Sequence, residues 1–594
     1  GSTSSNRGIR VATNLFRNNF THNRVLARGT ANNYGIELAT NSELNVFEYN
    51  NVTTNGTGAT NVGIYLISIL GRNNVTNNIV STNGTTNNYG VILQIDVNTT
   101  TVDRNNITTT GTGANNYGIY LVTRITSSNL TNNIINTSGT TTNYGINFDT
   151  SINDTIMLGN NITSGGSGAS NYGVLIATNS FRNNITNSLI STSGTTNNYG
   201  VQLSTDANTN VIARNNVTTT GTGANNFGVY LFTRSIDNNL TNNVINTSGT
   251  SNNYGIQLYT SVNDTIISNN SIFSGGSTSS NVGIRMITSS YRNNITHNRV
   301  LARGTANNYG TELATNIEFN IIEYNNFTTN GTGATNVGIY LISIAGGNNI
   351  TSNVIATNGT SSNQGIILQI DVNTTTVERN NVTTTGSAGS NFGIYLVTRV
   401  NSNNLTNNVI NTSGTTDNYG IQITTDSNDS IVLNNNITTG GTGATNIGVL
   451  ITTRAYRNNA TNNLITTRGT TNNYGMQLST DANTNVVARN NITTTGTGAN
   501  NFGVYLVTRS TSNNVTNNVI NTSGTSNNYG IQLDTSVNDT TVLNNSIASG
   551  GSAGSNFGIY AIAQSFRNNI THNRVLSRGT SSSEGIRLQN NGDI

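Results

Sequence analysis

The stretch Gly118-Ile119-Tyr120-Leu121 belongs to a short pattern, a glycine followed by apolar residues on alternate positions, that organises the whole chain. The glycine of this pattern recurs from Gly8 to Gly585, and the intervals between successive glycines are 27 and 28 residues in strict alternation, without an insertion. Self-similarity at a fixed period of this size indicates a solenoid, in which each repeat is one unit stacked on the next.

Each repeat contains three short apolar clusters separated by polar, glycine-containing turns. The glycine strand comes first; an apolar residue follows twelve positions later, as at Leu130, and a third cluster contains Ile135. Period-two alternation predicts strands with one buried face. An asparagine lies between the second and third clusters in almost every repeat, as at Asn133, and Ser188 is the exception. Identical residues stacked in register predict an amide ladder at this position.

Most repeats place Tyr, Phe, Val or Ile directly before the glycine, as Tyr117 does before Gly118. In register between coils, these residues would form an aromatic ladder. The exceptions are Arg7, Gln364 and Glu584.

These patterns predict an all-β fold: a single-chain parallel β-helix of about 21 coils of alternating 27 and 28 residues, with three short strands per coil. At about 4.8 Å per coil the stack would be on the order of 100 Å long. Helical alternatives fail because Thr, Asn, Gly and β-branched residues dominate and no sustained 3.6-residue apolar period exists.

A longer period of 275 residues lies above the coil repeat. Residues 17–25 return, with one change, as 292–300 and again as 567–575. We predict one continuous solenoid over residues 1–594, with long internal repeats at approximately 1–275 and 276–550 and a partial one at 551–594. Because the sequence starts in the middle of a repeat, we expect it to be a processed or partial piece of a longer chain.

The composition limits the classes of partner. The chain has no Pro, Cys, Trp or Lys, only 8% charged residues and a net charge of +3 carried by scattered arginines. No basic face forms, so we expect no nucleic-acid partner. No apolar stretch in this segment is long enough to span a bilayer.

The combination of Gly-Ile-x-Leu with Asn-Asn-x-Thr-x-Asn-x-Ile resembles right-handed parallel β-helix repeats of the pectate-lyase-like type. The Asn/Thr-rich form is similar to repeats of archaeal and bacterial cell-surface proteins, and the resemblance covers the whole chain. It implies a right-handed solenoid. It implies little about activity, because this fold hosts lyases, hydrolases, tailspikes, adhesins and passive surface rods.

Asn-x-Ser/Thr triplets, the acceptors of N-linked glycans, are the motif most informative about function. They occur 35 times, and two series repeat at fixed positions. The first series follows the glycine by eleven residues in every short, 27-residue coil. Its members are Asn19, Asn74, Asn129, Asn184, Asn239, Asn294, Asn349, Asn404, Asn459, Asn514 and Asn569. The second follows the ladder asparagine in the long coils: Asn51, Asn106, Asn161, Asn216, Asn326, Asn381, Asn436 and Asn491.

Strand alternation predicts that both series face solvent, since each asparagine precedes an inward apolar residue. Ser271 and Ser546 interrupt the second series. The alternative to glycosylation is that Asn and Thr recur at these positions because they stack well on a polar solenoid face. Four further Asn-Gly-Thr triplets are expected to lie in turns, where they can equally serve backbone geometry. These are Asn55, Asn83, Asn330 and Asn358.

Candidate catalytic and metal-binding residues are sparse. Glu48 and Asp103 share one column and lie two coils apart, near the separation of an inverting carboxylate pair, as do Glu323 and Glu378. A solvated column neutralised by neighbouring arginines is the preferred interpretation. The three histidines, at positions 22, 297 and 572, are ten coils apart, and the aspartates in turns lack the spacing of calcium-binding repeats. We therefore predict no catalytic, cofactor-binding or metal site and no enzymatic activity.

The leading hypothesis is a heavily N-glycosylated extracellular or cell-surface rod that forms a filament or surface-layer element by end-to-end self-association. An adhesin or fibre shaft that binds glycans through exposed faces is the alternative, with Tyr120, Tyr230, Tyr340 and Phe232 as contacts. A polysaccharide lyase or hydrolase is a third possibility, and an ice-binding face built on the threonine columns is a fourth.

Overall fold

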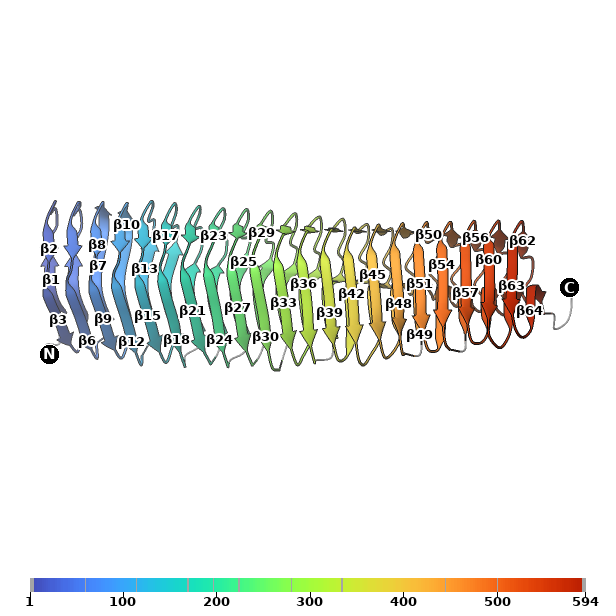
Figure 1. The fold of residues 1–594 in the computed structure, drawn as a ribbon. Helices are drawn as coiled ribbons and strands as arrows, with labels where there is room; N and C mark the ends of the chain where they lie inside the picture. The colour runs from blue at the N-terminus through green and yellow to red at the C-terminus, as the bar shows by residue number, and fades with distance from the viewer. Residues whose placement is uncertain are drawn as a thin grey trace. The chain divides into compact units, whose positions relative to one another are not determined.

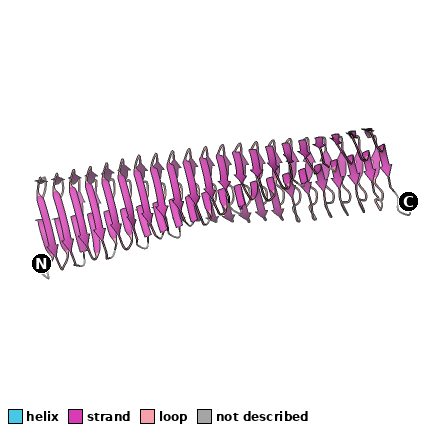
Figure 2. Ribbon diagram, turned by 60° about the horizontal axis from the view of Figure 1, so that its bottom comes forward, coloured by secondary structure: helices cyan, strands magenta, loops and turns pink. Residues whose placement is uncertain are grey.

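The computed structural model describes residues 5–589, apart from residues 59, 114, 168, 169, 196, 223, 224, 251, 279, 333, 334, 444, 499 and 563. The ends of the outermost predicted repeats, residues 1–4 and 590–594, lie outside the described residues. The described residues form strands β1 to β64 and contain no helix (Figure 2). They confirm an all-β parallel solenoid of right-handed type, with about 21 coils and three strands per coil.

Each coil contributes one strand to each of three parallel sheets, here named sheets 1, 2 and 3. In one coil these are β13 (Asn116–Thr123), β14 (Asn129–Thr131) and β15 (Ile134–Gly139). Sheet 1 contains the glycine pattern, every described strand of sheet 2 has three residues, and every described strand of sheet 3 has six and ends on glycine. The three apolar clusters predicted from the sequence are these three strands.

Contacts divide the chain into two compact units, Gly1–Val300 and Leu301–Ile594. Within each unit, strands of successive coils lie side by side along the three sheets (Figure 1). The first unit contains β1 (Asn6–Val11) to β32 (Asn294–Thr296), the second contains β34 (Asn308–Thr315) to β64 (Ser583–Leu588), and β33 (Arg299–Gly304) spans the boundary. In the second unit a representative coil is β43 (Asn391–Thr398), β44 (Asn404–Thr406) and β45 (Val409–Gly414).

Strands pair in parallel and in register, so each residue lies beside its equivalent in the next coil. Ile119 of β13 pairs with Ile146 of β16 (Asn143–Thr150), and Ile135 pairs with Ile162 of β18 (Asn161–Gly166). All four of these isoleucines are fully buried. The core of each unit is therefore a narrow column of aliphatic side chains shared by the three sheets.

The predicted amide ladder is present between sheets 2 and 3. The Asn133 side-chain amide donates to the Val102 carbonyl at 2.8 Å and to the Asn160 side-chain oxygen at 3.0 Å. Its own side-chain oxygen accepts from the backbone and side-chain nitrogens of Asn105, both at 3.0 Å. Each buried asparagine thus satisfies its polar atoms by bonding to its neighbours, which removes most of the cost of burial.

The predicted aromatic ladder is also present on sheet 1. In the first unit the rings stack continuously with centroids 4.6–5.2 Å apart; the members are Tyr89, Tyr117, Tyr144, Tyr172, Tyr199, Phe227 and Tyr254. Arg7, one of the exceptions, places its guanidinium 5.5 Å from the Tyr34 ring centroid. Ring stacking at this spacing adds to the ladder hydrogen bonds between coils.

The recurring glycine is required by close packing between sheets 1 and 3. A Cβ atom on Gly118 would lie 2.2 Å from Ile135 Cγ2 and 2.5 Å from the carbonyl oxygen of Gly145. Both distances are far below ordinary van der Waals contact. The pattern that defines the repeat therefore marks the place where two sheets approach too closely for any side chain.

Candidate functional site

The asparagines of the second sequon series occupy the first position of sheet 3 strands in the long coils. Asn106 begins β12 (Asn106–Gly111); it follows the buried ladder residue Asn105 and precedes the buried Ile107. All eight side chains of this series are exposed. The outward orientation expected from strand alternation is therefore observed at every position of this series, named here the sheet 3 row.

The asparagines of the first sequon series begin the three-residue strands of sheet 2, and their exposure is less uniform. Five are exposed: Asn19, Asn74, Asn129, Asn514 and Asn569. Six are only partly exposed and have a buried side-chain oxygen without a hydrogen-bond partner among the described residues: Asn184, Asn239, Asn294, Asn349, Asn404 and Asn459. The expectation of a fully solvent-facing series is thus only partly met on sheet 2.

The four Asn-Gly-Thr asparagines do not lie in turns, and that prediction is wrong. Each is the penultimate residue of a sheet 3 strand, as Asn330 is in β36 (Asn326–Gly331) and Asn358 in β39 (Val354–Gly359). Both are exposed and pair in register. The sequence signal misleads because the glycine after each asparagine ends the strand, and the turn begins one residue later.

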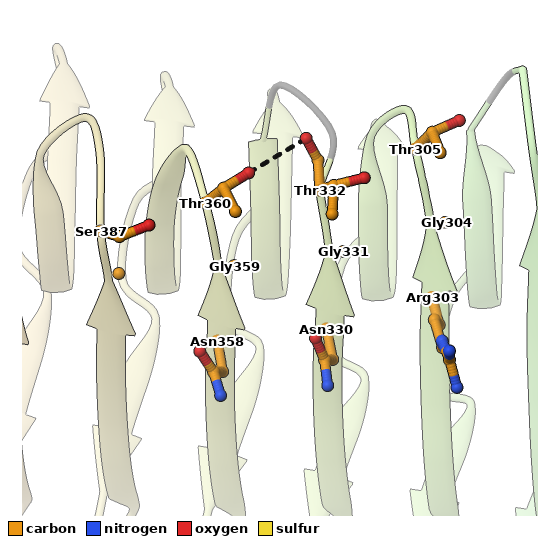
Figure 3. Close-up of a pocket in the computed structure, with 11 residues that line it drawn as sticks. Arg303, Gly304, Thr305, Asn330, Gly331, Thr332, Asn358, Gly359, Thr360 and Ser387 are labelled. Atoms are coloured by element: carbon orange, nitrogen blue, oxygen red, sulfur yellow. Dashed lines mark hydrogen bonds between the residues drawn. The ribbon is translucent and has the colours of Figure 1, made fainter.

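A shallow groove of about 700 Å³ runs along the glycine ends of sheet 3 strands in the second unit (Figure 3). Its lining consists of glycines between two columns of polar side chains, among them Arg303, Asn330, Thr332, Asn358 and Thr360. The Thr360 hydroxyl donates to the Thr332 carbonyl at 3.1 Å, which ties adjacent coils together at the rim. Glycine leaves the groove without a side-chain floor.

The carboxylate column has the predicted spacing but consists of bonded groups. Glu48 and Asp103 each pair in register with the intervening Thr76, so they are two coils apart. Asp103 accepts hydrogen bonds from the Thr131 hydroxyl at 2.6 Å and the Asn132 amide at 3.0 Å, and it pairs with Arg104 at 3.0 Å. This geometry favours a structural carboxylate over a general acid.

His22 and the four candidate aromatic residues are less available for a ligand than the sequence suggests. His22 stacks on Tyr49 with centroids 5.1 Å apart, and no group of three or more potential metal ligands occurs among the described residues. Tyr230, expected as an exposed contact, is instead buried and stacks on Phe227 at 4.8 Å. Tyr120 and Tyr340 are only partly exposed, as is Phe232. The hydroxyls of the two tyrosines donate to the next coil, Tyr120 to Asp149 at 2.8 Å and Tyr340 to Gln369 at 2.5 Å.

Burial raises the pKa values of the tyrosines in these columns, because the phenolate form is poorly solvated there. The pKa of Tyr65 rises to about 12, with the neighbouring Tyr34 and Glu37 adding to the effect of burial. Burial likewise raises the pKa of Tyr474 to about 12. These hydroxyls therefore remain protonated hydrogen-bond donors at any physiological pH.

Bidentate Arg–Asp pairs join the turns between sheets 1 and 2, a feature that the sequence analysis missed. Arg182 donates from its ε and η nitrogens to the two oxygens of Asp154 at 2.7 and 2.8 Å. Hydrogen bonding to the arginine lowers the pKa of Asp154 below its usual value. Equivalent pairs are Arg124–Asp96, Arg234–Asp206, Arg292–Asp264, Arg399–Asp371, Arg454–Asp426, Arg457–Asp429, Arg509–Asp481 and Arg567–Asp539. The constant separation of 28 residues between each Asp and its Arg is the feature of the sequence from which these pairs could have been predicted.

Comparison with known proteins adds little beyond the fold. No family model matches the sequence, and no curated protein matches it. Among solved structures, the chain is similar to the Dettilon tailspike protein (gp208), with 16% sequence identity and a TM-score of 0.24. The match covers 54% of this chain and spans 60% of the tailspike chain. No helix among the described residues is long and apolar enough to cross a membrane.

Proposed function

We propose that this chain is a non-enzymatic, N-glycosylated structural protein of the cell exterior that forms part of a filament or surface layer. The observation that carries the proposal is the sheet 3 row: eight sequon asparagines at one strand position, all exposed. A series of acceptors fixed to one strand position would distribute glycans evenly along a solenoid. Chance triplets in an Asn/Thr-rich sequence would fall on buried and exposed positions alike.

The proposal of no enzymatic activity rests on the uniform coil length and on the state of the carboxylates. Active sites usually lie on loops of unequal length, and here every interval is 27 or 28 residues. Asp103 is held by a hydroxyl, an amide and an arginine. Wild-type protein should therefore not depolymerise polysaccharides. Depolymerisation that is lost in Glu48→Gln and Asp103→Asn would establish the enzymatic alternative.

Self-association is proposed from the register of the coils. Because each coil repeats the strand positions of the one before, a coil of one copy can pair with a coil of another through the same hydrogen bonds and ladders. Glycans on the outer faces would oppose side-by-side association of the sheets and leave stacking along the coil axis as the favoured mode.

A glycan-binding role, as in an adhesin or fibre shaft, is the second candidate, and the groove lined by Asn330, Thr332 and Asn358 favours it. Site-by-site glycopeptide mass spectrometry of the native protein separates the two. Occupied asparagines in the sheet 3 row support the structural glycoprotein. Bare asparagines together with saturable binding of an oligosaccharide, lost in Asn330→Ala, would support the adhesin.

A further inference from the structure

Over eight successive coils of each unit, the outer column that carries the sheet 3 row alternates between asparagine and an exposed aliphatic residue. In the first unit the order along the column is Asn51, Ile79, Asn106, Ile134, Asn161, Leu189, Asn216 and Val244. In the second unit it is Asn326, Val354, Asn381, Val409, Asn436, Leu464, Asn491 and Val519. Each aliphatic residue pairs in register with a sequon asparagine on one or both sides.

These aliphatic side chains are unusually open for a regular position. Ile134 is 53% exposed, Val409 47% and Val519 52%. The next outward position on the same strands holds mostly Thr, Ser or Asn, as at Asn136 beside Ile134 and Asn411 beside Val409. Strand propensity alone does not explain why this column holds aliphatic residues, since threonine is also a good strand former and is abundant in this chain.

We propose that each exposed aliphatic residue of this column is the platform on which the first sugar of an adjacent N-linked glycan packs. The inference rests on the proposed glycosylation and adds a specific contact to it. One coil rises about 4.8 Å, so successive asparagines of the row are about 10 Å apart. That interval holds one aliphatic side chain, and a pyranose ring attached to the neighbouring asparagine lies above it.

The chemistry of the two partners fits. A pyranose ring has a face formed by C–H groups and a rim of hydroxyls, so it can cover a branched aliphatic side chain while its hydroxyls remain in water. The β-branched Ile and Val side chains are stiff and present a fixed methyl surface. Packing of this kind removes the exposed apolar area that a bare column would present.

The second outer row provides a contrast. On sheet 2 the residue between successive asparagines is also aliphatic in most coils, as at Ile156 and Ile266, which are 42% and 41% exposed. Six of the eleven asparagines there, Asn184 among them, are however only partly exposed and have a buried side-chain oxygen. Pairing of aliphatic residues with asparagines that are exposed at every position is therefore a property of sheet 3, and we assign the platform role to that sheet.

The test uses the full chain secreted from a eukaryotic host, which adds glycans with a chitobiose core. The variant is Val409→Ala, which removes both methyl groups of the side chain and, unlike threonine, creates no new Asn-x-Ser/Thr triplet at Asn407. Val409 pairs with Asn381 on one side and Asn436 on the other. The readout is the rate at which a peptide N-glycosidase releases the glycan from each asparagine of the native protein, followed by glycopeptide mass spectrometry.

Loss of about 30 Å² of apolar contact, at about 25 cal/mol per Å², corresponds to a rate about threefold faster. We expect this increase at Asn381 and Asn436. Asn326 and Asn491 do not pair with Val409 and serve as internal controls in the same molecule. In a matched variant, Val519→Ala, only the release from Asn491 should accelerate, because the other neighbour of Val519 is Ser546.

The possible outcomes separate the two hypotheses. Occupied sites with release rates unchanged in Val409→Ala would overturn the platform and leave the glycoprotein proposal intact. Bare asparagines throughout the sheet 3 row would overturn both. Side-by-side association of glycosylated chains, to the same extent in the wild type and in the variants, would also overturn the platform. The aliphatic column would then be covered by a second copy of the chain and not by a sugar.

Discussion

Replacement of Gly118 by alanine tests whether close packing between sheets 1 and 3 is the reason for the repeat. The added Cβ would lie 2.2 Å from Ile135 Cγ2 and 2.5 Å from the Gly145 carbonyl oxygen. Reaching ordinary contact at about 3.5 Å requires a displacement of about 1.3 Å. Neither neighbour can yield easily, since Ile135 is fully buried and the oxygen belongs to the backbone of the next coil.

Overpacking of a well-packed core costs about 1–3 kcal/mol. The loss of glycine flexibility in the unfolded chain offsets about 0.4–1 kcal/mol of that cost. Because neither neighbour can yield, we place the overpacking cost at the upper end of its range, about 3 kcal/mol. The net local destabilisation is then about 2 kcal/mol, or an opening equilibrium about thirtyfold more favourable. Hydrogen exchange measured by mass spectrometry on peptides covering β13 to β16 should detect this change.

The same column supplies a matched control. A Cβ on Gly585 would meet only Val575 Cγ1, at 3.9 Å, which is an ordinary contact. Gly585→Ala should therefore leave exchange in its own coil within the error of wild type. Normal protection in Gly118→Ala, or equal loss of protection in Gly585→Ala, would refute the packing explanation.

Three further predictions concern the ladders and the turns. Asn133→Leu should lower the free energy of unfolding of its unit by about 3 kcal/mol in chemical denaturation, because the buried polar atoms of Asn105, Val102 and Asn160 lose their hydrogen bonds. Asn133→Ser should cost less, since Ser188 occupies the equivalent position naturally. Equal costs for the two variants would contradict the ladder account. Hydrogen bonding to Arg182 lowers the pKa of Asp154 in the folded state, so the stability that this pair contributes is present above the unfolded pKa of about 4 and is lost as the pH falls through the lower folded value. Arg182→Gln should therefore reduce the loss of stability at acidic pH in thermal denaturation scans. An unchanged pH profile would count against the pair. Burial raises the pKa of Tyr65 to about 12, so the folded state keeps a proton that the unfolded state releases near pH 10. The stability of the folded state should therefore fall as the pH rises from about 10 to 12, and Tyr65→Phe should reduce that fall. A fall of the same size in Tyr65→Phe would exclude this residue as its source.

Much of the fold could be predicted from the sequence because the repeat constrains every coil in the same way. The interval between glycines sets the coil length, and alternation around Leu130 and Ile135 identifies the buried faces. Parallel, in-register pairing then places identical residues side by side, so the asparagine and aromatic ladders follow directly from the column positions.

Other features of the fold could not be predicted from the sequence and are visible only in the three-dimensional structure. The asparagine before each aromatic residue forms a second amide ladder, in which Asn116 donates to Asn143 at 3.0 Å. The sequence shows the recurring asparagine, but its inward orientation depends on how the chain turns from sheet 3 into sheet 1. The same limit explains the error at Tyr230, where the ladder rings cover a position that strand alternation assigns to solvent.

The candidate site was predictable in part for a related reason. Asn106 and its equivalents lie between two buried residues of a regular strand, so alternation fixes their outward direction. Asn184 and its equivalents begin strands of only three residues, and their exposure differs between coils although the strand position is the same, so alternation alone does not set how far such a side chain projects. Asn330 shows the converse, because an Asn-Gly-Thr triplet typical of a turn completes a strand instead.

Electron cryo-microscopy of the protein in its native, unlabelled form tests the central claim most directly. The glycosylated structural account predicts continuous assemblies in which branched density extends from the asparagines of the sheet 3 row, such as Asn51, Asn106 and Asn161. Isolated chains with bare asparagines at those positions would contradict it.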